Sequence, residues 1–206
     1  MLEELLVRFC SPTLAGLKTG SLVSCPYRCT ADAAGEIRLL NRTLAPKGLR
    51  LLPLRRQGGR VLVYLFRPAL LERDLSRRDA VRVLRAAGYP CAAPAPCLAE
   101  LMRRLNGSGG FPHEIGLFLG YPPEDVRGFI ENRAGNFKCA GCWKVYGDAD
   151  AAQRRFAQYR KCTDVYCRCW GRGSTLTRLA VPASAGKESP AELRLCFPVI
   201  ARPSGA

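Results

Sequence analysis

Histidine is nearly absent from this chain, because only His113 carries an imidazole among 206 residues. One histidine cannot supply both ligands of an HExxH zinc helix, and a Ser/His/Asp triad would have to use His113. The sequence has no G-x-S-x-G elbow to accompany it. The glycines around Lys18 also lack the G-x-x-x-x-G-K-[ST] spacing of a phosphate-binding loop. The sequence therefore does not indicate the motif-defined hydrolases or nucleotide-binding proteins.

Long hydrophobic runs are missing as well. The longest apolar segments, VLVYLF (61–66) and IGLFLGY (115–121), are far shorter than the roughly 20 residues that span a bilayer. The N-terminal MLEELLVRFC is acidic where a secretion signal would be basic, and it has no long apolar region. We therefore expect a cytoplasmic protein with no membrane partner.

Acidic residues are scarce and so is lysine. The 32 Lys and Arg residues outnumber the 17 Asp and Glu residues, and the formal net charge is +15. Most of the basic residues are arginines, which are scattered with no basic run beyond pairs such as Arg55-Arg56. Together with abundant Ala, Gly and Pro, this composition is typical of a GC-rich genome and favours a solvated basic surface. Binding of nucleic acid or another polyanion is the alternative.

Cysteine, by contrast, is plentiful. The number of cysteines is eleven, which is odd, and no export signal precedes them, so a disulfide framework is not expected. Cys139 and Cys142 form a C-x-x-C that could bind zinc or iron, with Cys25 and Cys29 or the cysteines of 162–169 completing a four-thiolate set. A redox pair would open a helix, whereas this one precedes the β-favouring WKVY. Unligated thiols are the third possibility.

Hydrophobic periodicity and turn signals predict a mixture of helices and strands. The predicted helices span 1–10, 35–45, 76–88, 97–105, 112–119, 123–131 and 149–163. The predicted strands span 17–24, 49–54, 60–66, 142–146 and 174–181. The RRQGG between 49–54 and 60–66 predicts an antiparallel hairpin with 60–66 central, while Pro53 places the other strand at an edge or a bulge.

This order of elements predicts an α+β domain over residues 1–181. Strands early and late, with helices grouped between them, indicate a mostly antiparallel sheet of about four to five strands on which the helices pack. The Pro-, Ser- and Ala-rich residues 182–206 are predicted to form a mobile tail.

His113 and Glu114 are the first candidates for catalysis. Pro112 is suited to the first position of a helix, and a helix N-terminus would keep the imidazole of His113 neutral and able to accept a proton or bind a metal. Glu114, directly adjacent, would point elsewhere, and a well-formed first helical turn is the simpler interpretation. If the protein is an enzyme for a small anionic substrate, Lys18 and Lys144 are the candidate ligand-binding cations.

Three stretches together resemble a known family. They are CSPTLAGLKTGSL (10–22), FPHEIGLFLGYPPEDVRGFIEN (111–132) and GCWKVYGDADAA (141–152). The chain resembles, over about residues 1–180, a bacterial family of the Firmicutes type known as domain of unknown function 3793. The resemblance implies no assigned activity. It implies an iron or redox context, and hence a non-catalytic ligand-binding or regulatory protein for which iron or zinc is a possible cofactor. We also expect the three stretches to converge in space.

Overall fold

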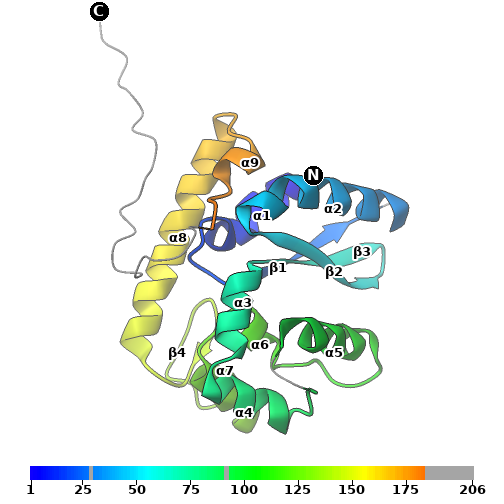
Figure 1. Ribbon diagram of the computed structural model, residues 1–206. Coiled ribbons are helices and arrows are strands. Elements are labelled where there is room, and N and C mark those ends of the chain that lie inside the picture. Colours follow the sequence, from blue (N-terminus) through cyan, green and yellow to red (C-terminus); the bar gives the residue numbers. More distant parts are fainter. Residues whose placement is uncertain (28–29, 91–92, 184–206) are drawn as a thin grey trace, which may run out of the picture.

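The centre of the molecule is a three-stranded antiparallel sheet. The computed structural model describes residues 1–27, 30–90 and 93–183. The strands are β1 (Gly20–Pro26), β2 (Arg50–Gln57) and β3 (Arg60–Phe66), in the order β1-β3-β2 (Figure 1). The sheet separates two layers of helices, because buried apolar side chains lie on both faces of β3 and each face must be covered.

The β2–β3 hairpin confirms the sequence prediction in detail. The turn residues Gly58 and Gly59 have φ of 56° and 69°, a conformation that costs glycine little. β3 is the central strand, and β2 lies at the edge with a shift in register between Pro53 and Arg55. The proline is tolerated there because an edge strand leaves one row of N–H groups unpaired.

Alternate side chains of β3 enter two different hydrophobic cores. Val61, Val63 and Leu65 pack in the first core, whereas Tyr64 and Phe66 pack in the second. The first core lies under α1 (Leu2–Leu14), α2 (Thr30–Leu44), the C-terminal half of α8 (Ala149–Gly171) and α9 (Leu176–Leu179). The second lies under α3 (Pro68–Leu75), α4 (Arg78–Ala86), α5 (Pro94–Asn106) and α6 (Ile115–Phe118).

A smaller third core forms between a short hairpin and α8, while Val126 of the neighbouring α7 (Pro123–Glu131) packs in the second core. The short hairpin β4 (Cys139–Ala140) and β5 (Lys144–Val145) packs on the N-terminal half of α8, and α7 contacts β5. Figure 1 shows α8 running past both the hairpin and α1, so one long helix connects the third core with the first.

The α+β class is confirmed, but the prediction of one sheet of four to five strands is wrong. The five strands of the described part are divided between the three-stranded sheet and the two-residue strands of the β4–β5 hairpin, and helix makes up 56% of the structure. The predicted strand 174–181 instead contains α9. Thr175 caps this helix by accepting a hydrogen bond from the backbone N–H of Arg178 (3.3 Å), and Leu176 is buried in the first core.

Several helix boundaries also differ from the prediction. α1 continues through Ser11-Pro12 to Leu14, although Pro12 cannot donate a backbone hydrogen bond to the preceding turn. The Ser11 hydroxyl donates to the carbonyl of Val7 there. α3 was not predicted. Ser76, the first residue of the predicted helix 76–88, instead follows α3 and donates to the Glu72 carbonyl (2.7 Å), and α4 begins only at Arg78.

Within the residues described, no helix is both long enough and apolar enough to cross a membrane. The predicted tail 182–206 lies outside the described residues from 184 onwards.

Candidate functional site

The three stretches singled out in the sequence converge, and Asp125 is the residue that joins two of them. Its buried carboxylate, in the first turn of α7, accepts hydrogen bonds from the indole Nε1 of Trp143 and from the backbone N–H groups of Tyr146 and Gly147, each at 2.7 Å. Three N–H donors compensate the charge that burial would otherwise penalise. α7 and the segment around β5 are therefore held as one unit.

The first stretch packs closely on the second. A Cβ on Gly20 would lie 2.8 Å from the carbonyl oxygen of Phe118, and a Cβ on Gly120 would lie 2.7 Å from the Thr19 hydroxyl oxygen. Both separations are shorter than a normal van der Waals contact between carbon and oxygen, so a side chain at either position would clash. Gly120 also has a φ of 75°, which favours glycine. The expected convergence of the three stretches is thus confirmed by direct contacts.

A hollow of about 390 Å³ opens where the second and third stretches meet. Its lining combines aromatic rings with one ammonium group and the Asp125 carboxylate. The ring-bearing residues and the lysine are Phe111, His113, Tyr121, Phe129, Trp143 and Lys144. Tyr121 stacks on Trp143 with ring centroids 4.8 Å apart, which makes a flat wall.

His113 lies at this hollow, but not at a helix N-terminus. The predicted helix start at Pro112 is wrong, because residues 113 and 114 form a turn and α6 begins only at Ile115. The backbone bonds here join residues three apart, such as Gly116 N–H to the His113 carbonyl (3.3 Å). The exposed imidazole instead lies between aromatic neighbours, with ring centroids 5.0 Å from Phe129 and 5.7 Å from Phe111.

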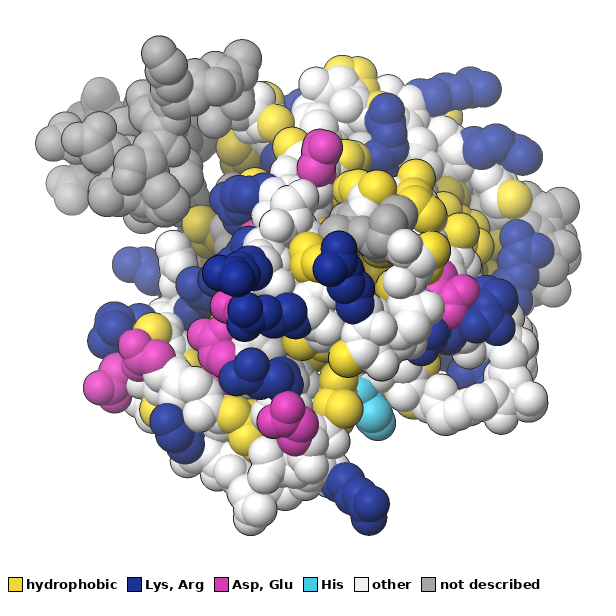
Figure 2. Space-filling model, turned by 60° about the horizontal axis from the view of Figure 1, so that its bottom comes forward, with side chains coloured by type: hydrophobic (Ala, Val, Ile, Leu, Met, Phe, Trp, Pro, Cys, Tyr) yellow, Lys and Arg dark blue, Asp and Glu magenta, His cyan; other side chains and the backbone are white. Residues whose placement is uncertain are grey.

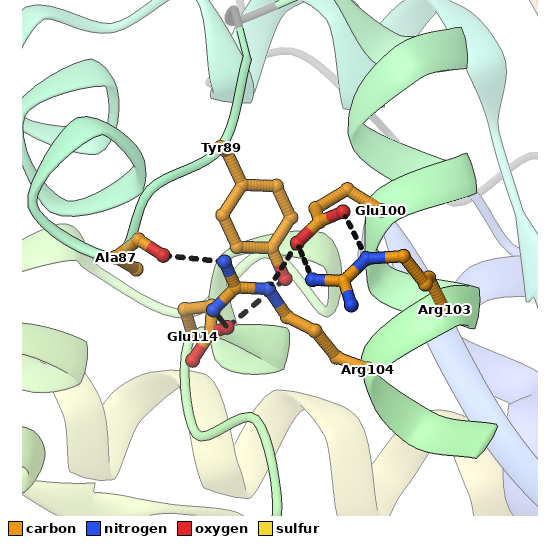
Figure 3. A network of polar contacts seen from close by, with 6 residues as sticks. All are labelled: Ala87, Tyr89, Glu100, Arg103, Arg104 and Glu114. Carbon is orange, nitrogen blue, oxygen red and sulfur yellow. Dashed lines mark hydrogen bonds and ion pairs between the residues drawn. The ribbon is translucent and has the colours of Figure 1, made fainter. Parts of the chain in front are cut away.

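Glu114 takes part in a buried polar network and is not among the residues that line the hollow. Its Oε1 accepts hydrogen bonds from the Tyr89 hydroxyl (3.0 Å) and from Arg104 (3.2 Å), as Figure 3 shows. Arg104 also donates to Glu100 (2.6 Å) and to the carbonyl of Ala87 (2.5 Å). Burial, followed by the nearby Glu114 carboxylate, raises the pKa of Tyr89 above its usual range. The network anchors the turn that carries His113.

The two candidate lysines lie in different hollows. Lys144 donates to the carbonyl of Ala134 (2.7 Å), and its ammonium lies 4.6 Å from the ring centroid of Phe137 at the edge of the aromatic hollow. Lys18 lines a second hollow of about 250 Å³, with its ammonium 5.3 Å from the ring centroid of Tyr121. His113 and Lys144 therefore share a site that does not include Lys18.

The candidate metal ligands lie at the β4–β5 hairpin. Cys139 is half-buried and Cys142 is exposed. In the part of the chain that the structure describes, no group of three or more His, Cys, Asp or Glu side chains is placed to hold a metal ion. Cys25 is buried in the first core, and burial raises the pKa of its thiol to about 11. Cys29 lies outside the described residues.

Sequence reasoning found His113 and Lys144 but missed the residues that shape the hollow. Asp125 and Phe129 lie in the predicted helix 123–131, where an acid in the first turn and an aromatic residue further along are ordinary features of a helix. Trp143 was assigned only to a β-favouring run. The available signal was the density of aromatic residues within the second and third stretches, since Tyr121, Phe129 and Trp143 all belong to them.

The comparisons with known proteins agree with the resemblance seen in the sequence. No curated protein and no solved structure matches the chain. A family model described as a protein of unknown function (DUF3793) matches residues 6–180, which include all three stretches. Because this match covers most of the 206 residues, the chain belongs to the DUF3793 family of proteins of unknown function.

Proposed function

We propose that this protein binds a small, planar, negatively charged ligand in the aromatic hollow and catalyses no reaction of its own. The observation that carries the proposal is the combination of the stacked Tyr121–Trp143 wall with the Lys144 ammonium around one hollow of about 390 Å³. Aromatic walls bind flat rings by stacking, and a single cation sets the orientation of a charged substituent.

Lys144 has the capacity to bind an anion in addition to its present partner. Its ammonium has three donors, and the carbonyl of Ala134 accepts from it at 2.7 Å. Its neighbours at the rim, Phe129 and Phe137, keep it over ring faces. Both oxygens of Asp125 already accept hydrogen bonds, which attenuates the repulsion between this carboxylate and an anionic ligand.

Binding is favoured over catalysis by the surroundings of His113. A general base is usually oriented by a carboxylate, but the neighbouring Glu114 is occupied by Tyr89 and Arg104. The contacts of the imidazole in the structure are with the rings of Phe111 and Phe129. An enzyme acting on a small anionic substrate through His113 is the alternative for this same hollow.

We propose that the link of this protein to iron or redox chemistry lies in the ligand that it binds. A conjugated ring system with an acidic substituent would fit both the hollow and such a context. Direct binding of iron or zinc would start from Cys139 and Cys142, which supply two of the four ligands of a tetrahedral site. The remaining ligands would have to come from outside the described residues or from a partner.

A pair of matched dyes tests the proposal. 1-Anilinonaphthalene-8-sulfonate is aromatic and anionic, whereas N-phenyl-1-naphthylamine has the same rings without the charge. We expect the sulfonate to bind the wild type, and Lys144→Met to weaken it about tenfold without changing binding of the neutral dye. Lys138→Met is the control, because Lys138 donates to the Gly147 carbonyl outside the lining.

The dye experiment also has outcomes that reject the proposal. Equal binding of the sulfonate to the wild type and to Lys144→Met would show that this ammonium plays no part. Weakening by Phe129→Leu of both dyes would support stacking in the hollow, and unchanged binding of both would place the dyes elsewhere. Turnover of a small anion that is lost in His113→Gln would favour the enzyme alternative.

Binding of a polyanion is a second candidate, favoured by the net charge of +15. On the face drawn in Figure 2, basic side chains are interleaved with acidic ones and do not form one continuous patch. Retention on immobilised double-stranded DNA, with an affinity that falls steeply as salt rises, would support this function. Elution at low salt would reject it.

A further inference from the structure

The second hollow surrounds the side chain of Lys18 and is separate from the aromatic one. It has a volume of about 250 Å³ and lies between the end of α1, the start of β1, the β4–β5 hairpin and α8. The residues of its lining that carry chemistry are Lys18, Ser21, Cys142, Arg160, Thr163 and Asp164. Nothing in the proposed function uses this hollow, so it can be tested independently.

The backbone holds Lys18 in place from two sides. The N–H groups of Leu17 and Lys18 both donate to the carbonyl of Pro12, at 2.8 Å and 3.1 Å. The hydroxyl of Tyr159 on α8 donates to the carbonyl of Leu17 (3.3 Å). Because this segment is fixed to both α1 and α8, the lysine side chain enters the hollow in a preorganised position.

Among the described residues, the ammonium of Lys18 forms no ion pair, although the Asp164 carboxylate lines the same hollow. Among the residues described, no carboxylate lies within 4.0 Å of it, and its nitrogen has no hydrogen-bond acceptor; its partner is the ring of Tyr121. Burial lowers the pKa of Lys18, opposed by interactions with the thiols of Cys10 and Cys142. Because the side chain is half-buried and its ammonium opens onto the hollow, an anion bound there would stabilise the charged form.

We propose that the Lys18 hollow is a binding site for a small oxyanion, either free or as the phosphate or carboxylate group of a metabolite. Lys18 supplies a charge that forms no ion pair with the described residues, and Arg160 on α8 supplies a second at the exposed side. Thr163 adds a hydroxyl donor. The exposed carboxylate of Asp164 lies in the same lining and offsets one of these positive charges. The remaining net positive charge suits a small anion.

Competitive acylation of the full-length protein tests this site. Trace acetic anhydride acylates an amine only in its neutral form, so the labelled fraction of each lysine against pH, measured by peptide mass spectrometry, gives the pKa of that lysine. Exposed Lys161 on α8 is the internal reference. We expect Lys18 to lose its proton, and so to become reactive, at a lower pH than Lys161. Inorganic phosphate should then raise the Lys18 transition by about one pH unit, because a nearby anion favours the charged amine.

Two controls separate site binding from general salt effects. Sodium chloride at the same ionic strength should leave the Lys18 transition where it was. Arg160→Ala should reduce the phosphate-induced shift, whereas Arg154→Ala, an exposed arginine on the same helix, should not.

The acylation profile has two results that overturn the proposal. A Lys18 transition at the same pH as that of Lys161 would mean that the ammonium is already stabilised. A lower transition that neither phosphate nor acetate moves would mean that the hollow does not accept an oxyanion. Because Lys144 is absent from this hollow, neither result depends on the dye experiment.

Discussion

The carboxylate of Asp125 accepts a 2.7 Å hydrogen bond from the indole of Trp143, a residue 18 positions further along the chain. The same carboxylate accepts from the backbone N–H groups of Tyr146 and Gly147. Trp143 forms part of the aromatic wall, so this one acidic side chain both attaches α7 to the β4–β5 hairpin and fixes the hollow.

Replacing Asp125 with asparagine should therefore destabilise the protein. The amide keeps one acceptor oxygen and turns an N–H₂ group either to the indole N–H of Trp143 or to the two backbone donors, and we expect the free energy of unfolding to fall by about 3 kcal/mol. Urea denaturation measures this change. Asp150→Asn is the matched control, because Asp150 is an exposed acid in the first turn of α8 and should change stability by less than about 0.5 kcal/mol. Equal losses in the two variants would contradict the role assigned to Asp125.

The network of Figure 3 should give the protein a specific sensitivity to acid. Hydrogen bonds from Arg103 and Arg104 lower the pKa of Glu100 from its ordinary value of 4.5 to about 2. A carboxyl group whose pKa is lower in the folded state stabilises the protein above its unfolded pKa, and loses that contribution as the pH falls through its folded pKa. The contribution of Glu100 should thus be full above about pH 4.5 and vanish near pH 2.

The comparison of wild type with Glu100→Gln across this pH range tests the prediction. The difference in their free energies of unfolding should shrink as the pH falls from 4.5 towards 2. Glu131→Gln is the control, because its carboxylate is exposed and lies 3.9 Å from Arg127. A wild-type advantage over Glu100→Gln that is independent of pH would show that the arginine bonds do not perturb this carboxylate.

A strained turn borders the aromatic hollow and should be open to stabilisation. Ala134 has a φ of 64°, which is unfavourable for any residue with a Cβ, and its carbonyl accepts the Lys144 hydrogen bond. Ala134→Gly should raise the free energy of unfolding by about 0.5–1 kcal/mol, since relief of strain outweighs the added entropy of the unfolded chain. Thermal unfolding measures this. Ala140→Gly, in β4, should instead lower stability. A loss of stability in both variants would contradict the claim that the backbone at Ala134 is strained.

Among the described arginines, Arg67 should be the one whose substitution lowers the stability of the protein most. Its buried guanidinium donates to the carbonyls of Thr13 (2.8 Å), Leu14 (2.7 Å) and Val181 (2.8 Å), and so joins the end of α1 to the segment after α9. Arg67→Met removes these three hydrogen bonds, and although the carbonyls of Thr13 and Leu14 keep backbone donors from Gly16 (3.2 Å) and Val181 (3.0 Å), it should cost about 3 kcal/mol of stability. The exposed Arg73, which pairs with Asp74, provides the control: Arg73→Met should have little effect on the urea midpoint.

The parts of the fold that were predictable depend on local signals. The β2–β3 hairpin follows from two apolar runs around Gly58-Gly59, and the start of α8 follows from Asp148, whose carboxylate accepts from the N–H of Ala151 (2.9 Å). α9 was mistaken for a strand because four residues carry no periodicity. The length and burial of such a segment depend on tertiary contacts, here of Leu176 with the first core.

The candidate site was only partly predictable for the same reason. His113 and Lys144 stood out by residue type alone. Asp125 did not, because an acid in the first turn of a helix is already explained by the helix dipole. Its three donors come from residues 143–147, a relation that only the folded chain reveals. The separation of Lys18 from His113 likewise depends on how the Tyr121–Trp143 stack and the hairpin divide the two hollows.

The most direct test of the proposed function is a ¹H–¹⁵N correlation spectrum recorded during titration with 1-anilinonaphthalene-8-sulfonate. The protein has two tryptophans: Trp143, in the wall of the aromatic hollow, and Trp170, packed against the first core. The account predicts that the indole N–H signal of Trp143 moves together with the amides of residues 111–121, while the indole signal of Trp170 stays in place. Movement of the Trp170 signal alone, or of neither signal at saturating dye, would contradict it.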